Sequence, residues 1–313
     1  AEVALSDPGG DTTQDARRAL GEKLTSVYTS PEEMLAKEKP VIALVSMEAG
    51  FAPPAIGAAL DAGCHVMAEK PACLRAEDFE KLTRQANSKN LLLMLALANR
   101  LNPEVREARR LIQEGRIGKI YGSELHLIAD QTRLSRPGYQ QSWYAQKARG
   151  AGGHLIWLGI HWIDLVMYLT GSSIVEVAGF TGVVGGQPLD VEDSAALAVR
   201  FDNGTLGTVT SGYYLDKGYH SHIKIWGSKG WLQIERHGGS PLRWYSTGDG
   251  APKVREYKPP EGPTGYSPFV ASCVRASMGL QPPPLTAGES LRALKTVFAS
   301  YRAAETGRSQ RIV

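Results

Sequence analysis

The sequence predicts an α/β domain with a doubly wound parallel sheet, followed by an α+β domain whose sheet is mainly antiparallel. Its 313 residues are the length of roughly two domains of about 100–200 residues each. Strand-like and helix-like segments alternate over about the first 130 residues, which is typical of right-handed strand–helix–strand units. After that, strands joined by tight turns prevail, which is typical of antiparallel hairpins.

The predicted parallel strands are short apolar runs without polar alternation, as expected for strands that are buried on both faces. They are Ala1–Ser6, Val41–Ser46, His65–Ala68 and Leu91–Ala98. The helices between and after them are marked by an early proline, a closing glycine or an apolar stripe. They are Pro31–Ala36, Pro53–Ala62, Ala76–Lys89 and Pro103–Glu114.

We place the domain boundary after residue 118, so the predicted domains are residues 1–118 and 119–313. The second domain begins with a strand over Ile120–Asp130 and contains an apolar helix over residues 153–169. Asp202-Asn203-Gly204 and Gly227–Gly230 are hairpin signals. The further strands are Val175–Val184, Ser194–Phe201, Thr205–Tyr214, Ser221–Trp226 and Trp231–Glu235. Two closing helices, expected to pack back on the first domain, are Ser267–Met278 and Ala287–Glu305.

Composition and charge exclude several classes of protein. Lys and Arg total 35 against 32 for Asp and Glu, and the basic residues are dispersed, so neither nucleic acid nor a membrane is an expected partner. The longest apolar run, Leu91–Ala98, is far shorter than the roughly 20 residues of a membrane helix. Cys64, Cys73 and Cys273 have no CxxC or Cys/His spacing, so we expect no disulfide framework, no metal site and a reducing, cytoplasmic compartment.

Polar side chains follow three of the predicted parallel strands, and ligands bind at the carboxyl ends of such strands. Asp7 either bonds to the ribose hydroxyls of a dinucleotide, disfavouring a 2′-phosphate, or opens the Asp-Pro-Gly turn. Lys70 either serves a substrate oxygen as hydrogen-bond donor or base, or is an exposed lysine paired with Glu69. Asn99 and Asn102 follow the fourth strand and offer amides at the same edge.

One stripe of the predicted helix 153–169, at about 100° per residue, holds four polar or aromatic side chains: His154, Trp157, His161 and Asp164. Such a stripe would line a pocket, and a histidine can exchange a proton with a hydroxyl near neutral pH. Alternatively, the histidines are buried, hydrogen-bonded and inert. Trp143 and Tyr144 in the preceding loop either stack on a sugar ring or cap a core.

Several short motifs occur in an order and spacing that resemble the Gfo/Idh/MocA oxidoreductases, the glucose–fructose oxidoreductase and inositol dehydrogenase family. The resemblance extends over nearly the whole chain and ends in the last helix. Its most specific parts are the Glu69-Lys70-Pro71 turn and the Gly-x-His helix. The motifs are Glu69-Lys70-Pro71, Asn99-Arg100-Leu101-Asn102-Pro103, Gly118-Lys119-Ile120, Gly152-Gly153, Gly159-Ile160-His161-Trp162-Ile163-Asp164-Leu165 and Ile225-Trp226-Gly227-Ser228-Lys229-Gly230.

The resemblance implies a Rossmann-like NAD(P)-binding domain and a second domain with a large open sheet used in homo-oligomer contacts, in a dimer or tetramer. It implies a dehydrogenase or reductase acting on a CH–OH group of a sugar, sugar derivative or cyclic polyol. Lys70 would be the lysine near the reacting hydroxyl, and His161 the histidine at the substrate site. Asp7 favours NAD over NADP. The expected site residues are Lys70 and His161 for catalysis; Asp7, Glu69, Lys70 and Asn99 for the cofactor; and Asn102, Trp143, Tyr144, His154 and Trp157 for the substrate.

Three departures from the family pattern matter. The family opens with a strand, a Gly-x-Gly-x-x-Gly loop and a helix; here Ala1–Ser6 corresponds to its second strand, so the Rossmann-like sheet is N-terminally incomplete in this sequence. We expect either an upstream segment outside this sequence or a protein impaired in cofactor binding. Trp157 stands where the family often has an Asp, and Glu48 lies in the segment expected at the cofactor. Two other functions therefore stay open: an NAD-dependent glycosidase acting through transient oxidation, and a non-catalytic sugar- or cofactor-binding protein.

Overall fold

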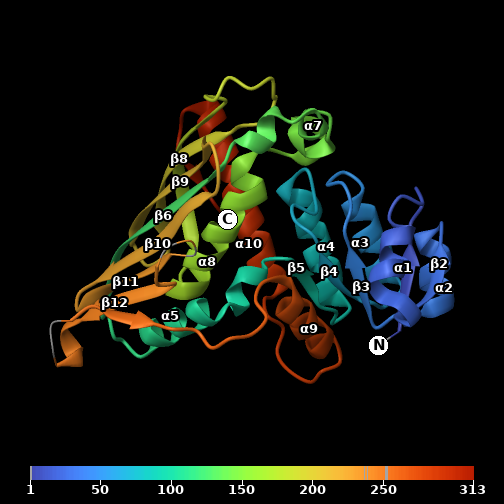
Figure 1. Ribbon diagram of the computed structural model, residues 1–313, viewed down its shortest axis with the longest axis horizontal. Helices are drawn as coiled ribbons and strands as arrows, with labels where there is room; N and C mark the ends of the chain where they lie inside the picture. The colour runs from blue at the N-terminus through green and yellow to red at the C-terminus, as the bar shows by residue number, and fades with distance from the viewer. Residues whose placement is uncertain (1, 236, 238, 251–252) are drawn as a thin grey trace.

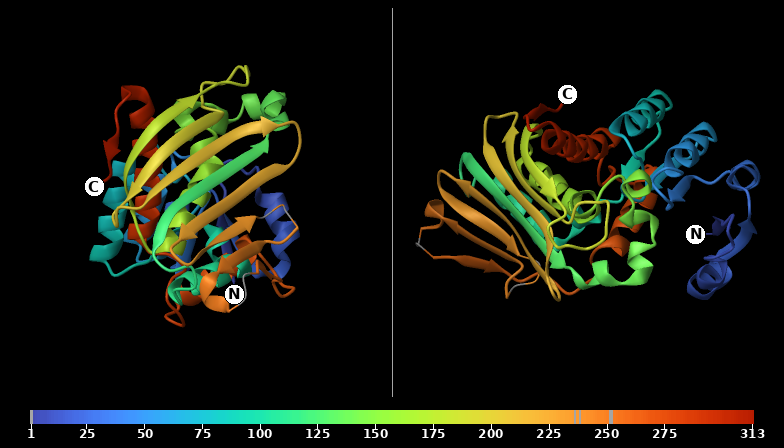
Figure 2. Two further views of the ribbon diagram at one scale, coloured as in Figure 1. Left: turned by 90° about the vertical axis from the view of Figure 1, so that its left-hand side faces the viewer. Right: turned by 90° about the horizontal axis from the view of Figure 1, so that it is seen from above.

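The computed structural model describes residues 2–235, 237, 239–250 and 253–313. An N-terminal part of parallel strands and helices lies beside one large sheet (Figure 1). Helices α8 (Ile160–Thr170) and α10 (Ala287–Thr306) lie between the two and cover one face of the sheet, whereas the opposite face is open to view (Figure 2). The main hydrophobic core is continuous through these helices, so the two parts share it.

The parallel strands form two separate groups. β1 (Val3–Ser6) pairs with β2 (Leu24–Tyr28), while β3 (Ile42–Val45), β4 (His65–Ala68) and β5 (Leu93–Leu95) pair with one another. Every predicted parallel strand is confirmed within its described residues, although the run Leu91–Ala98 is strand over only three of them. Ala1 lies outside the described residues.

The predicted helices of this part are confirmed as α2 (Pro31–Glu38), α3 (Ala52–Asp61), α4 (Ala76–Ser88) and α5 (Pro103–Gln113). The start of α2 shows why such predictions work, because the hydroxyl of Ser30 accepts the backbone N–H of Glu33 at 3.1 Å. The sequence does not predict α1 (Thr13–Leu20), which buries none of its side chains and so carries no apolar signal.

The large sheet has nine strands in the order β13-β12-β11-β10-β6-β9-β8-β7-β14. It is mainly antiparallel as predicted, and both predicted hairpins are present, between β8 and β9 and between β10 and β11. The parallel pairing of β6 with β9 is not predicted, nor are β12, β13 and β14. The strands are β6 (Ile120–Asp130), β7 (Ile174–Gly182), β8 (Ser194–Phe201), β9 (Leu206–Leu215), β10 (Tyr219–Gly227), β11 (Gly230–Glu235), β12 (Leu242–Ser246), β13 (Arg255–Tyr257) and β14 (Gln310–Arg311).

The C-terminal helices tie the two parts together. α9 (Tyr266–Ser277) and α10 match the predicted closing helices, and α10 packs against α4 and β5. Lys295 of α10 pairs with Glu80 of α4 at 3.1 Å, and the hydroxyl of Ser290 accepts the N–H of Leu95 in β5. Within the described ranges, no helix has the length and apolar character that crossing a membrane requires.

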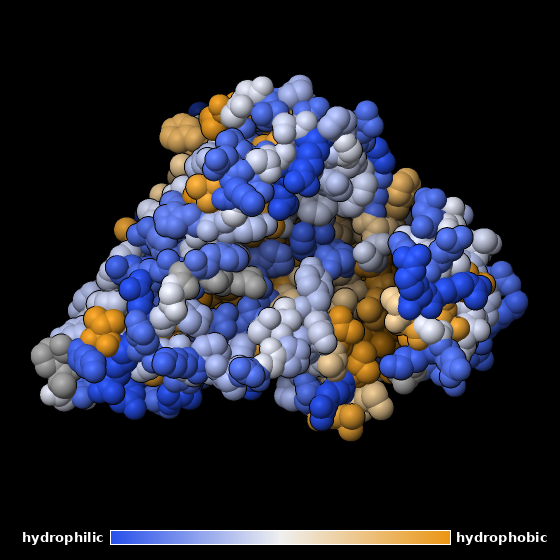
Figure 3. Space-filling model, in the orientation of Figure 1, coloured by the Kyte–Doolittle hydropathy of each residue, from blue (hydrophilic) through white to orange (hydrophobic). Residues whose placement is uncertain are grey.

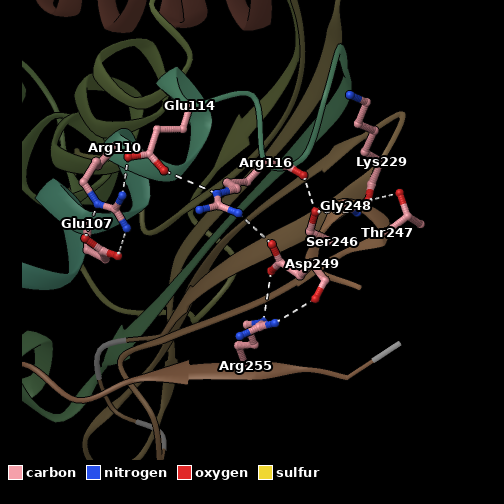
Figure 4. A network of polar contacts seen from close by, with 10 residues as sticks. All are labelled: Glu107, Arg110, Glu114, Arg116, Lys229, Ser246, Thr247, Gly248, Asp249 and Arg255. Atoms are coloured by element: carbon pink, nitrogen blue, oxygen red, sulfur yellow. Dashed lines mark hydrogen bonds and ion pairs between the residues drawn. The ribbon is translucent and has the colours of Figure 1, made fainter. Parts of the chain in front are cut away.

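A polar network fastens the end of α5 to the far edge of the sheet (Figure 4). The guanidinium of Arg116 contacts Asp249 at 2.9 Å, and Arg255 contacts the same carboxylate at 3.0 Å. The hydroxyl of Ser246 donates to the backbone oxygen of Arg116 at 2.6 Å. These contacts lie at the opposite end of α5 from the site residues, so we assign them to the fold.

Candidate functional site

Lys70 lies in a turn directly after β4, and the Lys70–Pro71 peptide bond is cis. Its ammonium lies 4.4 Å from the ring centre of Trp157, over the indole face. Burial lowers the pKa of Lys70 to about 8, with the nearby charge of Glu69 opposing this shift and that of Arg133 adding to it. Lys70 is therefore mostly protonated at neutral pH but holds its proton far less tightly than an exposed lysine does.

Glu69 braces this turn. Its carboxylate accepts the backbone N–H of Lys70 at 3.2 Å and is hydrogen-bonded to the hydroxyl of Tyr266. Burial is the main cause of the raised pKa of Tyr266, so its hydroxyl keeps its proton and donates to the carboxylate. Glu69 thus stabilises the turn of Lys70, and its predicted role in cofactor binding stays a prediction.

The helix opposite Lys70 begins as a π-helix over Leu155–Gly159 and continues as α8. Its start is held by the buried carboxylate of Glu192, which accepts the N–H groups of Gly153 and Leu155 at 2.6 and 2.9 Å and the hydroxyl of Tyr301 at 2.9 Å. A Cβ on Gly153 would lie 1.8 Å from the backbone oxygen of Glu192, so only glycine permits this approach. No motif or periodicity predicts this role for Glu192, which lies in a loop far from the helix in the sequence.

The predicted stripe along this helix is wrong in part. Trp157 and His161 are partly exposed and lie about one helical turn apart, and Trp157 contacts Lys70. His154 is fully buried instead, with Nδ1 2.6 Å from the hydroxyl of Ser211, and Asp164 is buried as well. The π-helical turn changes the direction of His154 relative to the later residues, because its i→i+5 bonding alters the angular spacing of a uniform α-helix. Asp164 lies beyond this turn in α8, where its bonds to the buried Arg100 hold it inside.

Burial also decides the charge of His154. Desolvation and the charge of Arg133 lower its pKa to about 3, so it is neutral at physiological pH. Of the two interpretations of this histidine, the buried and hydrogen-bonded one describes its position. Asn102 is likewise only 1% exposed, and its side-chain oxygen accepts the N–H of Gly265. We therefore leave both residues out of the mechanism proposed below.

Aromatic side chains form a wall beside Lys70. Trp157 lies 5.1 Å from Trp143 and 5.6 Å from Tyr144 between ring centres, and Tyr144 lies 5.0 Å from Tyr139. The indole N–H of Trp157 donates to the backbone oxygen of Gly152, which fixes the ring that carries Lys70. The structure thus brings together the aromatic residues that the sequence proposed as a stacking face.

Two arginines near the site, Arg133 and Arg100, are not among the site residues that the sequence predicts. Arg133, in the loop after β6, donates to the hydroxyl of Tyr219 at 3.1 Å and adds to the low pKa of Lys70. Arg100, after β5, is buried; it makes two bonds to Asp164 at 2.9 and 2.6 Å and one to Glu289 at 2.6 Å. Arg100 links the end of β5 to α8 and α10. It therefore holds α8, the helix of His161, against the sheet in which β4 precedes Lys70.

The other predicted cofactor residues lie at the ends of β1 and β5. The carboxylate of Asp7 accepts the N–H of Thr12 at 3.0 Å and the hydroxyl of Thr13 at 2.7 Å, and this second bond is the main cause of its lowered pKa. Asn99 is partly exposed in the turn after β5. Asp7 and Asn99 thus follow strands of two separate parallel groups, and their cofactor roles stay predictions.

Glu48, the unexpected acid after β3, is neutralised by the structure. Both its carboxylate oxygens bond to the guanidinium of Arg149, at 2.8 and 2.6 Å. Arg149 belongs to α7 (Lys147–Gly150), which follows the aromatic segment. This bidentate pair links α7 of the second domain to the segment that follows β3. In Figure 3, hydrophobic residues gather in a recess over the region of β3 and β4.

Two family models match this chain. One describes the NAD-binding Rossmann fold of the oxidoreductase family and covers residues 2–97; the other describes the GFO/IDH/MocA C-terminal domain and covers residues 105–233. The chain belongs to the Gfo/Idh/MocA oxidoreductase family, and its N-terminal part is the NAD-binding Rossmann-type domain of that family.

Individual relatives agree with this class. The chain is 24% identical over 231 residues to myo-inositol 2-dehydrogenase of Thermotoga maritima, a match that covers 72% of this chain and 65% of that protein. It is 31% identical over 173 residues to levoglucosan dehydrogenase of Pseudarthrobacter phenanthrenivorans, covering 49% and 44%. It thus spans less than two thirds of the length of these two relatives. A crystal structure of an oxidoreductase domain protein from Kribbella flavida has the same fold, with a TM-score of 0.89 at 22% identity, covering 100% of this chain and 90% of that one.

Proposed function

We propose that the protein is an NAD-dependent oxidoreductase that transfers a hydride between the nicotinamide and a CH–OH group of a sugar, sugar derivative or cyclic polyol. One observation carries the proposal: a desolvated ammonium, Lys70, is held over Trp157 at a strand end of an NAD-binding domain, opposite the helix of His161. Two relatives named above act on inositol and levoglucosan, which supports a sugar or polyol as substrate.

Each residue has a distinct part in this chemistry. NAD, when bound, supplies the hydride acceptor. Lys70 donates a hydrogen bond to the reacting oxygen and stabilises the negative charge that develops there, which a desolvated ammonium does strongly. His161 exchanges the hydroxyl proton with solvent. Trp143, Tyr144 and Trp157 support the sugar ring through its C–H groups.

Steady-state assays of the full-length protein test this proposal. NAD reduction is followed with a panel of hexoses, hexosides and inositols. Lys70→Ala and His161→Ala should each lower turnover by about 10²–10⁴-fold. Lys229→Ala, a change in the hairpin between β10 and β11 and beside the network of Arg116, is the matched control and should leave turnover unchanged. Unchanged turnover in both site variants would refute the roles of Lys70 and His161.

Product analysis separates the other two functions. An NAD-dependent glycosidase would release the aglycone of a hexoside without net formation of NADH. A non-catalytic protein would bind NAD tightly and turn over none of the panel. Net NADH that matches the oxidised sugar one to one supports the dehydrogenase.

We also propose that copies of the chain associate through the open sheet face. Phe180 on β7 is 78% exposed, beside a shallow depression of about 560 Å³ lined mainly by small residues of β7, β8 and β9. Exposed apolar surface of this kind marks interfaces. Phe180→Asp should convert the oligomer into monomers by light scattering, whereas Met278→Asp, on the exposed end of α9, should not. A monomeric parent would contradict this proposal.

The compartment that we propose is the cytoplasm. Cys64, Cys73 and Cys273 are buried free thiols, which suits a reducing environment. Fractionation of cells that express the full-length protein should place it with cytoplasmic markers, and an extracellular location would contradict this.

A further inference from the structure

The loop after β6 brings a second cation to the site. Arg133 lies in the turn Thr132–Ser135, where its Nη2 donates to the hydroxyl of Tyr219 at 3.1 Å and its guanidinium lies 5.6 Å from the ring centre of Tyr213. Its side chain is half-buried against these two strands of the large sheet. Tyrosines surround this position, and the carboxylate of Asp130 interacts with Arg133 at longer range than an ion pair.

Arg133 and Lys70 mark the two ends of one aromatic wall. Each neighbouring pair along the wall is in contact, through ring packing or, for Tyr213 and Tyr139, through a hydrogen bond. The positive charge of Arg133 contributes to the low pKa of both Lys70 and His154, so these groups lie within reach of one another's charge. The wall runs in the order Arg133, Tyr213, Tyr139, Tyr144, Trp157 and Lys70.

The guanidinium of Arg133 has no direct ion pair in the part of the chain that the structure describes, and the carboxylate of Asp130 interacts with it only at longer range. Among the ion pairs of the described residues, none includes Arg133, whereas the buried Arg100 pairs with Asp164 and Glu289. A guanidinium offers five N–H donors, and one hydrogen bond to Tyr219 uses one of them. A half-buried cation without a direct ion pair is incompletely compensated for its desolvation, and an anionic ligand would supply the missing partner.

We propose, on the basis of the function proposed above, that the substrate is a sugar or polyol derivative with an anionic group, a carboxylate or a phosphate, and that Arg133 binds this group. The planar fork of a guanidinium matches the paired oxygens of both groups. Lys70 then serves the reacting hydroxyl at the other end of the wall, and the aromatic rings between the two cations support the sugar ring. Arg133 is a specificity-determining residue in this arrangement.

Matched sugars test the inference. D-Glucose and D-galactose are compared with their uronates and their 6-phosphates, using the full-length protein and NAD. We expect kcat/KM for one anionic series to exceed that of the neutral sugars by on the order of 10–100-fold, the effect of one charge-assisted hydrogen bond. The preferred series distinguishes a carboxylate from a phosphate. Arg133→Met should abolish the preference, whereas Arg136→Met, an exposed arginine in the same loop, should keep it.

The outcomes separate this inference from the proposed function. If neutral and anionic sugars react equally well and Lys70→Ala abolishes both activities, the anionic substrate class is refuted and the dehydrogenase stands. If no sugar reduces NAD, tryptophan fluorescence measures binding instead. Tighter binding of anionic sugars that Arg133→Met removes would then support the inference. Equal binding, or no binding of any anionic sugar, would overturn it.

Discussion

Replacing Lys70 by methionine should make the protein more stable while it abolishes turnover. The pKa of Lys70 is lowered from 10.5 to about 8, and each pKa unit corresponds to about 1.36 kcal/mol, so its surroundings, mainly through desolvation, cost the charged form about 3 kcal/mol. The contact of the ammonium with the Trp157 ring at 4.4 Å offsets about 1 kcal/mol of this. Methionine fills a similar volume without charge, so we expect the free energy of unfolding to rise by about 2 kcal/mol near about pH 6.

The pH dependence gives the sharper test. The unfolded chain binds the Lys70 proton more tightly, at 10.5, than the folded protein does, at about 8. The stability of the parent therefore rises with pH between about 8 and 10.5, and the advantage of Lys70→Met shrinks over that range. Urea unfolding followed by tryptophan fluorescence at about pH 6 and about pH 9.5 measures the difference.

The control for this experiment is Lys81→Met, because Lys81 is 68% exposed and its weak ion pair with Asp78 contributes little. It should change stability slightly and equally at both pH values. The reasoning is refuted if Lys70→Met is less stable than the parent near about pH 6, or if its advantage is the same at both pH values.

Three further substitutions probe the supporting structure. Arg100→Met should lower the free energy of unfolding by about 3–5 kcal/mol in urea, because it leaves a buried carboxylate without its partner, whereas the exposed Arg110→Met should cost far less. Gly153→Ala should lower the thermal unfolding temperature strongly, because the new Cβ would lie 1.8 Å from a backbone oxygen, whereas Gly262→Ala points into open space and should not. Asp7→Ser should raise the ratio of kcat/KM for NADP to that for NAD, since the carboxylate disfavours a 2′-phosphate; an unchanged ratio would leave Asp7 only its bonds within the turn.

The parallel strands could be predicted because burial on both faces leaves an uninterrupted apolar run, as in His65–Ala68. Other elements carry no such signal. α1 buries nothing, and the strand β13 has only three residues. The order of strands in the large sheet could not be predicted either. The pairing of β6 with β9 joins segments about 80 residues apart, and local sequence patterns carry no information on such contacts.

At the site, motif and position predicted Lys70 and the helix of His161, because a strand end and a helix are local features. Arg133 and Glu192 could not be predicted, since each reaches the site from an irregular loop whose conformation depends on distant contacts. His154 was assigned to the pocket on the assumption of a regular helix. No residue type predicts the π-helical turn between residues 155 and 159, and this turn changes the direction of the His154 side chain relative to Trp157 and His161.

Trp157 contacts the ammonium of Lys70 but brings no negative charge to it, and burial remains the main cause of the low pKa of Lys70. An indole face holds the ammonium without a full negative charge, so the charge of Glu69 compensates the burial only in part. Trp157→Asp would place a carboxylate near the ammonium; at about 4 Å and an effective dielectric constant of about 20, the attraction is about 4 kcal/mol, or about 3 pKa units. We therefore expect the pKa of Lys70 to rise from about 8 to above 10 in this variant.

The pH profile of kcat/KM shows this shift directly. If protonated Lys70 donates to the reacting oxygen, the parent loses activity as the pH rises through about 8, and Trp157→Asp moves that loss above about pH 10. Trp157→Phe keeps an aromatic face and should leave the loss near about pH 8. A loss at the same pH in all three proteins would show that Lys70 does not govern the profile. Activity that instead increases through about pH 8 would make Lys70 the base and not the donor, because only the deprotonated amine accepts a proton.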